Sequence, residues 1–283
     1  MRLGSIRYIN SLPVDLGFLS GKIPIPAQII RGVPSDLNQQ ILYGRIDISP
    51  VSVYWYAKHQ SEFLILPDIS ISSESGVQSV LLFSRVPAGQ LKEEMIYVTG
   101  EGKTTPVLLE ILCQKLYGFK PRLRALETPL KEIAPDIQAV LLIGDEALVT
   151  REKLKDSGWF ITDLAEEWKR WTGLGFVFAV WAARREYMRQ KPEEAHQIYE
   201  AILESKKWGL SHREAVIAEA YRQTALPEAI LRAYFSCLSY ELDDSLIRGM
   251  RLYFQYAADL GLLSEIKAPK FAGRLVKSGL GLL

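Results

Sequence analysis

Short apolar runs alternate with stretches of helical spacing over the first 84 residues. Runs bounded by Gly, Pro or Asp predict strands at 3–9, 27–32, 45–52 and 77–84. Between them, Pro34 and Ser35 begin a segment with apolar residues at helical spacing that ends at Gly44, and a short aromatic helix is predicted at 53–59. This alternation favours an α/β protein with a mostly parallel sheet.

The same alternation returns in the middle of the chain. Strands are predicted at 95–100, 121–126, 139–143 and 176–183. The helix after the first of them has Thr104 or Thr105 as its expected N-cap, Pro106 at its first helical position and Gly118 at its end. A second α/β unit is therefore predicted after the first.

From Pro192 onward the apolar residues recur at i, i+3, i+4 and i+7, which predicts a run of helices that we interpret as packing elements and not as part of a site. Crossovers near 85–94 and 176–184 would join two lobes. Residues 1–88 and 180–283 would form a discontinuous first lobe with a helical C-terminal region, and residues 89–179 an inserted second lobe. The expected architecture is a two-lobe clamp of the periplasmic-binding-protein-like (type II) kind.

Composition narrows the class of partner. The 283 residues are 48% hydrophobic and 24% charged, with a formal net charge of +1. A nearly neutral chain does not favour a nucleic-acid or membrane partner, and no apolar run approaches the roughly 20 residues that span a bilayer. The chain opens on a strand without a basic and apolar leader, so we expect a cytoplasmic protein. No nucleotide-binding glycine motif or metal-ligand cluster occurs, and no cofactor or metal is predicted. Composition leaves the oligomeric state open.

A clamp of this kind binds its ligand between the lobes, where strands end and helices begin, and free backbone N–H groups there favour anions. Small polar side chains occupy such places in three segments, Tyr8–Pro13, Ser49–Ser52 and Gly102–Pro106. Each candidate also has an ordinary structural interpretation. Asn10 would stabilise a turn, and Ser52 and Thr105 would be plain N-caps. Ser79, inside a predicted strand, would fill space, and Lys103 would be solvated.

The stretch 141–184 combines two apolar runs, a Gly-Asp corner, a Trp-rich helix and a Thr-Gly turn, and its spacing predicts a pocket wall. Asp145 and Glu146 are adjacent at a strand-to-helix junction, so they do not face each other as an acid–base pair. The first turn of a helix suits them better. None of His59, His196 and His212 follows a predicted strand, and no Ser-His-Asp order is present.

Seven segments, in this order and spacing, resemble the chorismate dehydratases of the futalosine route to menaquinone. They are RYINSLPV (7–14), VPSDLNQQILYGRIDISPVS (33–52), LPDISISSESGVQSVLLFS (66–84), GKTTPVLLEIL (102–112), LLIGDEAL (141–148), DLAEEW (163–168) and TGLGFVFAVWAAR (172–184). The resemblance covers nearly the first two thirds of the chain. One departure is Gly175, where the family usually carries proline.

The resemblance implies a hydro-lyase that converts chorismate to 3-[(1-carboxyvinyl)oxy]benzoate, with Asn10 and Ser79 as the residues associated with catalysis. The substrate-binding candidates that accompany them are Ser52, Thr104, Thr105, Gly144 and Asp145. Two alternatives stay open. The sister enzyme that forms 1,4-dihydroxy-6-naphthoate is associated with a histidine after the corresponding apolar strand, where this chain reads Ile143-Gly144-Asp145. A non-catalytic protein that binds small carboxylates is the other.

Overall fold

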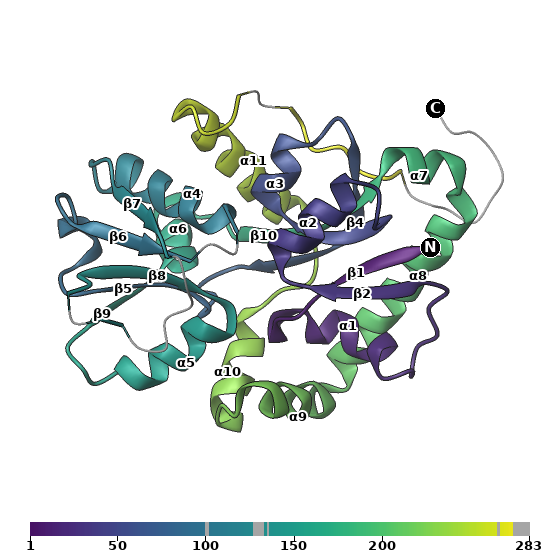
Figure 1. The fold of residues 1–283 in the computed structure, drawn as a ribbon, viewed down its shortest axis with the longest axis horizontal. Helices are drawn as coiled ribbons and strands as arrows, with labels where there is room; N and C mark the ends of the chain where they lie inside the picture. The colour runs from purple at the N-terminus through teal and green to yellow at the C-terminus, as the bar shows by residue number, and fades with distance from the viewer. Residues whose placement is uncertain (100–101, 127–132, 135, 265–266, 274–283) are drawn as a thin grey trace.

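The computed structural model describes residues 1–99, 102–126, 133–134, 136–264 and 267–273. Within these ranges, ten strands form two five-stranded sheets, one in each lobe of the molecule (Figure 1). The first sheet has the order β2-β1-β3-β10-β4 and contains β1 (Arg2–Ile6), β2 (Gln28–Gly32), β3 (Ile48–Ser52), β4 (Phe63–Ser73) and β10 (Phe176–Arg184). The second has the order β7-β6-β8-β5-β9 and contains β5 (Val80–Ser84), β6 (Met95–Val98), β7 (Arg122–Ala125), β8 (Ala139–Ile143) and β9 (Phe160–Asp163).

In each sheet four strands run in one direction and one runs against them. The reversed strand is β10 in the first sheet, antiparallel to β3 and β4, and β5 in the second, antiparallel to β8 and β9. These are the strands on which the chain enters a sheet from the other lobe. In each sheet the other four strands direct their carboxyl ends toward the opposite lobe. A strand that enters the sheet from the opposite lobe must therefore run antiparallel to them. The two-lobe α/β architecture with mostly parallel strands is confirmed.

The chain changes lobe at places that differ from those expected. It leaves the first sheet at Ser73 and enters the second at Val80, and it returns between α6 (Leu164–Thr172) and Phe176. The predicted boundaries at 88/89 and 179/180 are therefore wrong with respect to the sheets: β5 belongs to the second sheet, and all of β10 to the first. The Pro-Ala-Gly sequence that suggested a crossover forms a short 3₁₀ turn, η2 (Ala88–Gln90), beyond β5.

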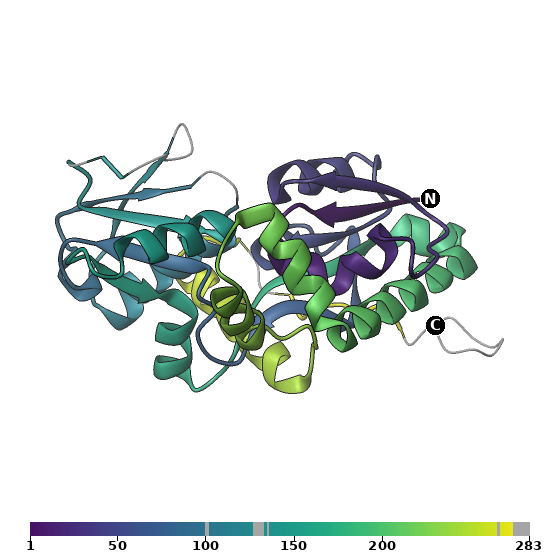
Figure 2. The same ribbon diagram turned by 90° about the horizontal axis from the view of Figure 1, so that it is seen from below.

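Helices cover the faces of both sheets. Those of the first lobe are α1 (Leu12–Leu19), α2 (Pro34–Leu42), α3 (Val53–Lys58), α7 (Arg185–Gln190) and α8 (Pro192–Ser211). The second lobe has α4 (Thr104–Ile111), continued by a π-helical turn η3 (Leu112–Leu116), and α5 (Gly144–Leu154) and α6. The chain continues through α9 (Arg213–Thr224), α10 (Glu228–Cys237) and α11 (Asp244–Asp259). Figure 2 shows α9 and α10 at the junction of the lobes.

Strand β4 was not predicted, although it is the longest strand described. Pro67 and Asp68 interrupt its apolar pattern, and both residue types are rare in strands. The structure accommodates them at an irregularity: Asp68 has a φ of 60°, and the register with β10 shifts between Val180 and Ala182. A bulge therefore keeps the strand continuous past a proline.

Aromatic packing holds the segment between α6 and Phe176, where the chain returns to the first lobe. Trp168 on α6 is fully buried, with its ring edge-on to Phe176 at 5.5 Å and to Tyr256 of α11 at 6.0 Å between ring centroids. Its Nε1 donates to the carbonyl of Gly175 at 3.3 Å. A Cβ at Gly175 would lie 2.9 Å from the carbonyl oxygen of Ser73, so this turn has no room for the proline that the family usually carries.

Candidate active site

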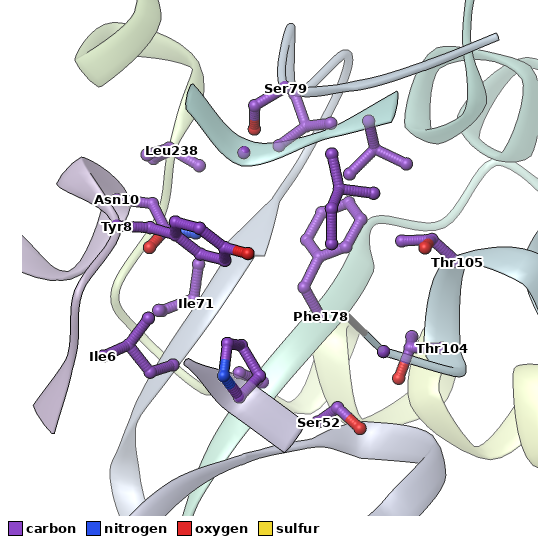
Figure 3. A pocket seen from close by; sticks show the side chains of 17 residues that line it. Ile6, Tyr8, Asn10, Ser52, Ile71, Ser79, Thr104, Thr105, Phe178 and Leu238 are labelled. Atoms are coloured by element: carbon purple, nitrogen blue, oxygen red, sulfur yellow. The ribbon is translucent and has the colours of Figure 1, made fainter. Parts of the chain in front are cut away.

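A cavity that is partly open to solvent, with about 690 Å³ of empty space including its mouth, lies between the lobes at the ends of the strands. Its walls come from the carboxyl ends of β1, β3, β4 and β8 and from the starting ends of the two reversed strands (Figure 3). The described lining residues are Ile6, Tyr8, Asn10, Pro34, Ser52, Ile71, Val77, Ser79, Val80, Gly102, Thr104, Thr105, Ile143, Gly144, Phe178, Ala179 and Leu238. Six of the seven predicted site residues are among them, and Asp145 is not.

Asn10 lies in η1 (Ile9–Ser11), a single 3₁₀ turn between β1 and α1. The turn is held from two sides: the Ser11 hydroxyl donates to the carbonyl of Ile6 at 2.9 Å, and the Tyr240 hydroxyl donates to the carbonyl of Asn10 at 2.8 Å. The Asn10 side-chain oxygen is inaccessible to solvent and has no partner among the described residues. A turn-stabilising asparagine would use this oxygen, so the purely structural interpretation of Asn10 fails.

Ser79 lies on the cavity wall formed by the second lobe, one residue before β5. Its position depends on the strained backbone of the preceding residue, Gln78. Gln78 has a φ of 61°, a region that side chains other than glycine rarely adopt. The Asp163 carboxylate fixes this conformation by accepting the N–H groups of Val77 at 2.8 Å and Gln78 at 2.6 Å. Burial raises the pKa of Asp163, and the backbone donors around it oppose that rise. Backbone strain held in place beside a polar cavity residue is typical of functional sites.

The Ser79 hydroxyl is itself held by a second hydroxyl. Tyr234, on α10, donates to Oγ of Ser79 at 3.0 Å, and both side chains are buried. Because burial raises the pKa of Tyr234 far above its usual range, the phenol keeps its proton and remains a donor. With one lone pair of Ser79 occupied, its own proton is available to a ligand in the cavity.

Thr104 and Thr105 begin α4 on the opposite wall, but neither is its N-cap. Lys103 holds that position and is exposed, so the helix starts earlier than expected and Pro106 is its third residue. The Thr104 hydroxyl instead accepts the N–H of Tyr54, in the first turn of α3, at 3.1 Å. Thr104 thus joins the lobes and keeps a hydroxyl proton for a ligand. The interpretation of Thr105 as a plain N-cap is wrong.

Ser52 occupies the N-cap position of α3, yet its side chain makes no capping hydrogen bond. The backbone N–H that it would cap is the one bonded to Thr104. Its hydroxyl lies at the edge of the cavity shared with α4 (Figure 3). The plain-cap interpretation therefore fails for Ser52 as well.

Gly144 and Asp145, at the start of α5, contact the first lobe across the cleft. Gly144 has a φ of 62°, and a Cβ there would lie 3.5 Å from the ring of Tyr8. Asp145 does not line the cavity. Its Oδ1 accepts the N–H of Ile9 at 3.3 Å, next to Asn10, while its place in the first turn of α5 also suits the helix dipole. The role of Asp145 as a substrate ligand therefore stays a prediction, and in this structure its carboxylate contacts the opposite lobe.

The cavity wall is nearly uncharged. Of the described lining residues, Tyr8 is the one with an ionisable side chain, and all three histidines lie elsewhere. The described residues also contain no group of three or more His, Cys, Asp or Glu side chains placed to hold a metal ion. An anionic ligand would be met by hydroxyls, an amide and backbone N–H groups.

Three residues of the candidate site, Tyr8, Tyr234 and Leu238, were not singled out by the sequence pattern. Tyr8 belongs to a segment that was selected, but its strand-end position carried no specific signal. Tyr234 and Leu238 come from the helical region that was interpreted as packing alone, and that interpretation is wrong. Nothing in the helical periodicity marks Tyr234, because it occupies an ordinary core position of α10. Only its contact with Ser79 reveals it.

The fold and the cleft define a two-lobed, periplasmic-binding-protein-like clamp. Solved structures support that class: a protein of Archaeoglobus fulgidus aligns with a TM-score of 0.74 at 17% identity over 92% of this chain and 97% of its own. The alkanesulfonate-binding protein SsuA of Xanthomonas axonopodis pv. citri aligns with a TM-score of 0.67 at 14% identity over 93% of both chains. Identities this low show the fold alone.

Sequence comparison is more specific. Residues 1–259 match the menaquinone biosynthesis family. A chorismate dehydratase of Thermus thermophilus is 32% identical over 92% of this chain and 95% of its own length. A chorismate dehydratase of Campylobacter jejuni is 29% identical over 63% of this chain and 66% of its own length. The chain belongs to the menaquinone biosynthesis family. No helix in its described part is long and apolar enough to cross a membrane.

Proposed function

We propose that this protein is a chorismate dehydratase that releases water from chorismate to give 3-[(1-carboxyvinyl)oxy]benzoate. One observation carries the proposal: the fold brings Asn10 and Ser79, 69 positions apart in the sequence, to one cavity with a nearly uncharged wall. The 32% identity to a protein named for this activity supports it. The substrate is a small dicarboxylate, and a mostly apolar cavity with a few hydroxyls and one amide suits a ligand of that kind.

The reaction removes the ring proton at C3 and the hydroxyl at C4, and the ring becomes aromatic. Aromatisation supplies the driving force, so the protein has mainly to hold the ring, stabilise developing charge and help the C4 oxygen leave. Asn10, with a buried amide oxygen that lacks a partner among the described residues, would orient the ring substituents. Ser79, with its proton directed away from Tyr234, would donate to a carboxylate or to the departing oxygen.

The two carboxylates would be held at the other walls. Thr104 and Thr105, with the first N–H groups of α4, would bind one, and Ser52 with nearby backbone would bind the other. Gly144 would leave room for Tyr8, and Asp145 would hold the lobes together through Ile9. Lobe closure would make these dipoles effective, because exclusion of water lowers the dielectric around them.

The described lining holds no carboxylate or imidazole that could take the ring proton. We therefore assign this role to the enolpyruvyl carboxylate of the substrate itself, which lies beside C3. The sister reaction that forms 1,4-dihydroxy-6-naphthoate is less well supported, since its associated histidine is absent at Ile143-Gly144-Asp145. A cytoplasmic location and action without a nucleic-acid or membrane partner remain predictions that accompany the proposal.

Incubation of the purified protein with chorismate, followed by liquid chromatography, tests the function. Appearance of 3-[(1-carboxyvinyl)oxy]benzoate in step with loss of chorismate is the expected result. Tight binding of chorismate without turnover would instead identify a carboxylate-binding protein. If the protein neither converts nor binds chorismate, both the dehydratase and the carboxylate-binding function are excluded.

A further inference from the structure

Tyr8 has a hydroxyl group that the protein leaves unused. The oxygen is inaccessible to bulk solvent and has no hydrogen-bond partner among the described residues, and the same is true of the nearby Asn10 side-chain oxygen. A buried polar group without a partner costs about 1–3 kcal/mol, so such a group in a cavity indicates an atom supplied by a ligand. Figure 3 shows the Tyr8 hydroxyl directed into the cavity, toward the side where Phe178 lies.

The ring that carries this hydroxyl is held in place by both lobes. Tyr8 follows β1 in the first lobe, and its ring faces the Cα of Gly144 in the second, where a Cβ would come within 3.5 Å of three ring carbons. Gly144 is in turn fixed by its N–H, which donates to the carbonyl of Ser79 at 2.8 Å. When the lobes are closed, the hydroxyl is therefore directed at one region of the cavity.

The chemistry of the site selects the ligand atom. Hydroxide is a poor leaving group, so departure of the C4 oxygen requires a proton donor. Among the described lining residues, Tyr8 is the one with an ionisable side chain, and a phenol is a better proton donor than the hydroxyl of serine or threonine or the amide of asparagine. The carboxylate-binding groups at Ser52, Thr104 and Thr105 lie on other walls (Figure 3).

We infer that Tyr8 is a catalytic residue that donates its phenolic proton to the departing C4 oxygen, an inference that rests on the proposed dehydration. The C3–H bond breaks and its proton passes to the substrate carboxylate. The C4–O bond breaks, a C3–C4 double bond forms, and the leaving oxygen takes the Tyr8 proton to become water. The carboxylic acid then returns its proton to the Tyr8 phenolate. No oxidant or reductant is needed, and the net loss is one water molecule.

The Tyr8→Phe variant tests this role, because it keeps the ring against Gly144 and removes only the hydroxyl. The expected result is a fall in kcat of about 100-fold or more, the usual size of an acid–base contribution, with KM changed less than threefold. The melting temperature should stay level or rise, since the lost hydroxyl had no partner. Tyr56→Phe is the matched control: Tyr56 is fully buried and donates to the carbonyl of Lys270, outside the cavity, so its loss should lower the melting temperature and leave kcat unchanged.

Product affinity separates this role from carboxylate binding. The product 3-[(1-carboxyvinyl)oxy]benzoate keeps both carboxylates and lacks the C4 oxygen, so Tyr8→Phe should bind it as tightly as the wild type in calorimetry. A loss of product affinity would show that Tyr8 holds a carboxylate, and an unchanged kcat would show that it has no role in the reaction. Either outcome overturns the inference. Failure of the wild-type protein to convert chorismate would instead reject the proposed function.

Discussion

The hydroxyl of Tyr234 donates a 3.0 Å hydrogen bond to Oγ of Ser79, so that a C-terminal helix holds a side chain on the second sheet. Tyr234 is completely buried, and Ser79 is 4% exposed. The bond fixes the direction of the Ser79 hydroxyl from behind, which leaves its proton free on the cavity side. Tyr234 is thus a positioning residue in the proposed reaction.

Tyr234→Phe is expected to lower kcat by about tenfold, because a freely rotating Ser79 hydroxyl is in the productive orientation for less of the time. KM should change little. The variant should also lose about 1 kcal/mol of unfolding free energy with the buried bond. Steady-state kinetics and urea unfolding measure the two effects. Tyr56→Phe, with a comparable buried bond elsewhere, would lose stability alone; equal losses of activity in both would contradict a positioning role.

Ser79→Ala should remove most turnover and also destabilise the fold. The substitution leaves the Tyr234 hydroxyl buried without its partner, at a cost of about 1–3 kcal/mol. Addition of Tyr234→Phe should restore part of that stability and none of the activity, a coupling that a double-mutant cycle measures. Ser84→Ala is the control at the other end of β5: Ser84 is buried and donates to the carbonyl of Val86, away from the cavity. Near-wild-type turnover of Ser79→Ala would reject its catalytic role.

Asn10→Ala should remove most turnover without loss of stability. The amide oxygen that it deletes has no partner in the described part of the chain, so the unfolding free energy should change by less than about 1 kcal/mol. Asn38 on α2 offers a matched control, because it is also buried with an unpartnered side-chain oxygen but does not line the cavity. Loss of activity in Asn10→Ala with full activity in Asn38→Ala is the expected pattern. Equal activity in both variants would exclude Asn10 from the reaction.

Asp145→Ala should weaken lobe closure, since its Oδ1 accepts the Ile9 N–H across the cleft. A bond to a charged acceptor contributes about 1.5–3 kcal/mol, so KM should rise by roughly tenfold or more, with a smaller effect on kcat. Small-angle scattering with product should show less compaction than the wild type. Asp156→Ala, an exposed aspartate in the same lobe, should behave as wild type. Wild-type KM and compaction in Asp145→Ala would show that closure does not depend on this contact.

Asp15 on α1 should make stability depend on pH. Burial raises the pKa of this carboxyl from 3.8 to about 7, opposed by hydrogen bonds from Ser5 and Ser11 and by the charge of Arg31. The folded state therefore retains a proton between pH 4 and 7 that the unfolded chain has lost, and stability falls as pH rises through that interval.

Asp15→Asn, which stays uncharged, should be free of this contribution. Between pH 5 and pH 8 its unfolding free energy should rise relative to the wild type by about 3 kcal/mol, the equivalent of two pKa units. Urea denaturation at the two pH values measures the difference. The same pH dependence in both proteins would show that Asp15 is already ionised in the folded state at pH 5.

Periodicity predicted most elements correctly where local and tertiary preferences agree. The helix between Pro34 and Gly44 and the apolar strands β8 and β10 lie close to their expected positions. It failed at β4, where Pro67 and Asp68 occupy a bulge that only the pairing with β10 makes possible. The periodicity also placed the first lobe boundary after β5 instead of before it, because β5 would have the same apolar pattern in either sheet.

The sequence alone determined the two-lobe class, the family resemblance and six of the residues that line the cavity, out of seven predicted, because strand ends and helix starts are local features that converge at the cleft of this fold. The tertiary structure decided which polar groups are already bonded and which remain free. It turned Asp145 toward the opposite lobe, placed Tyr234 behind Ser79 and left the hydroxyl of Tyr8 without a partner among the residues that the structure describes. These relationships join residues separated by up to 155 positions. Local spacing cannot encode them, since hydrogen bonds between distant segments depend on how the lobes and the C-terminal helices pack.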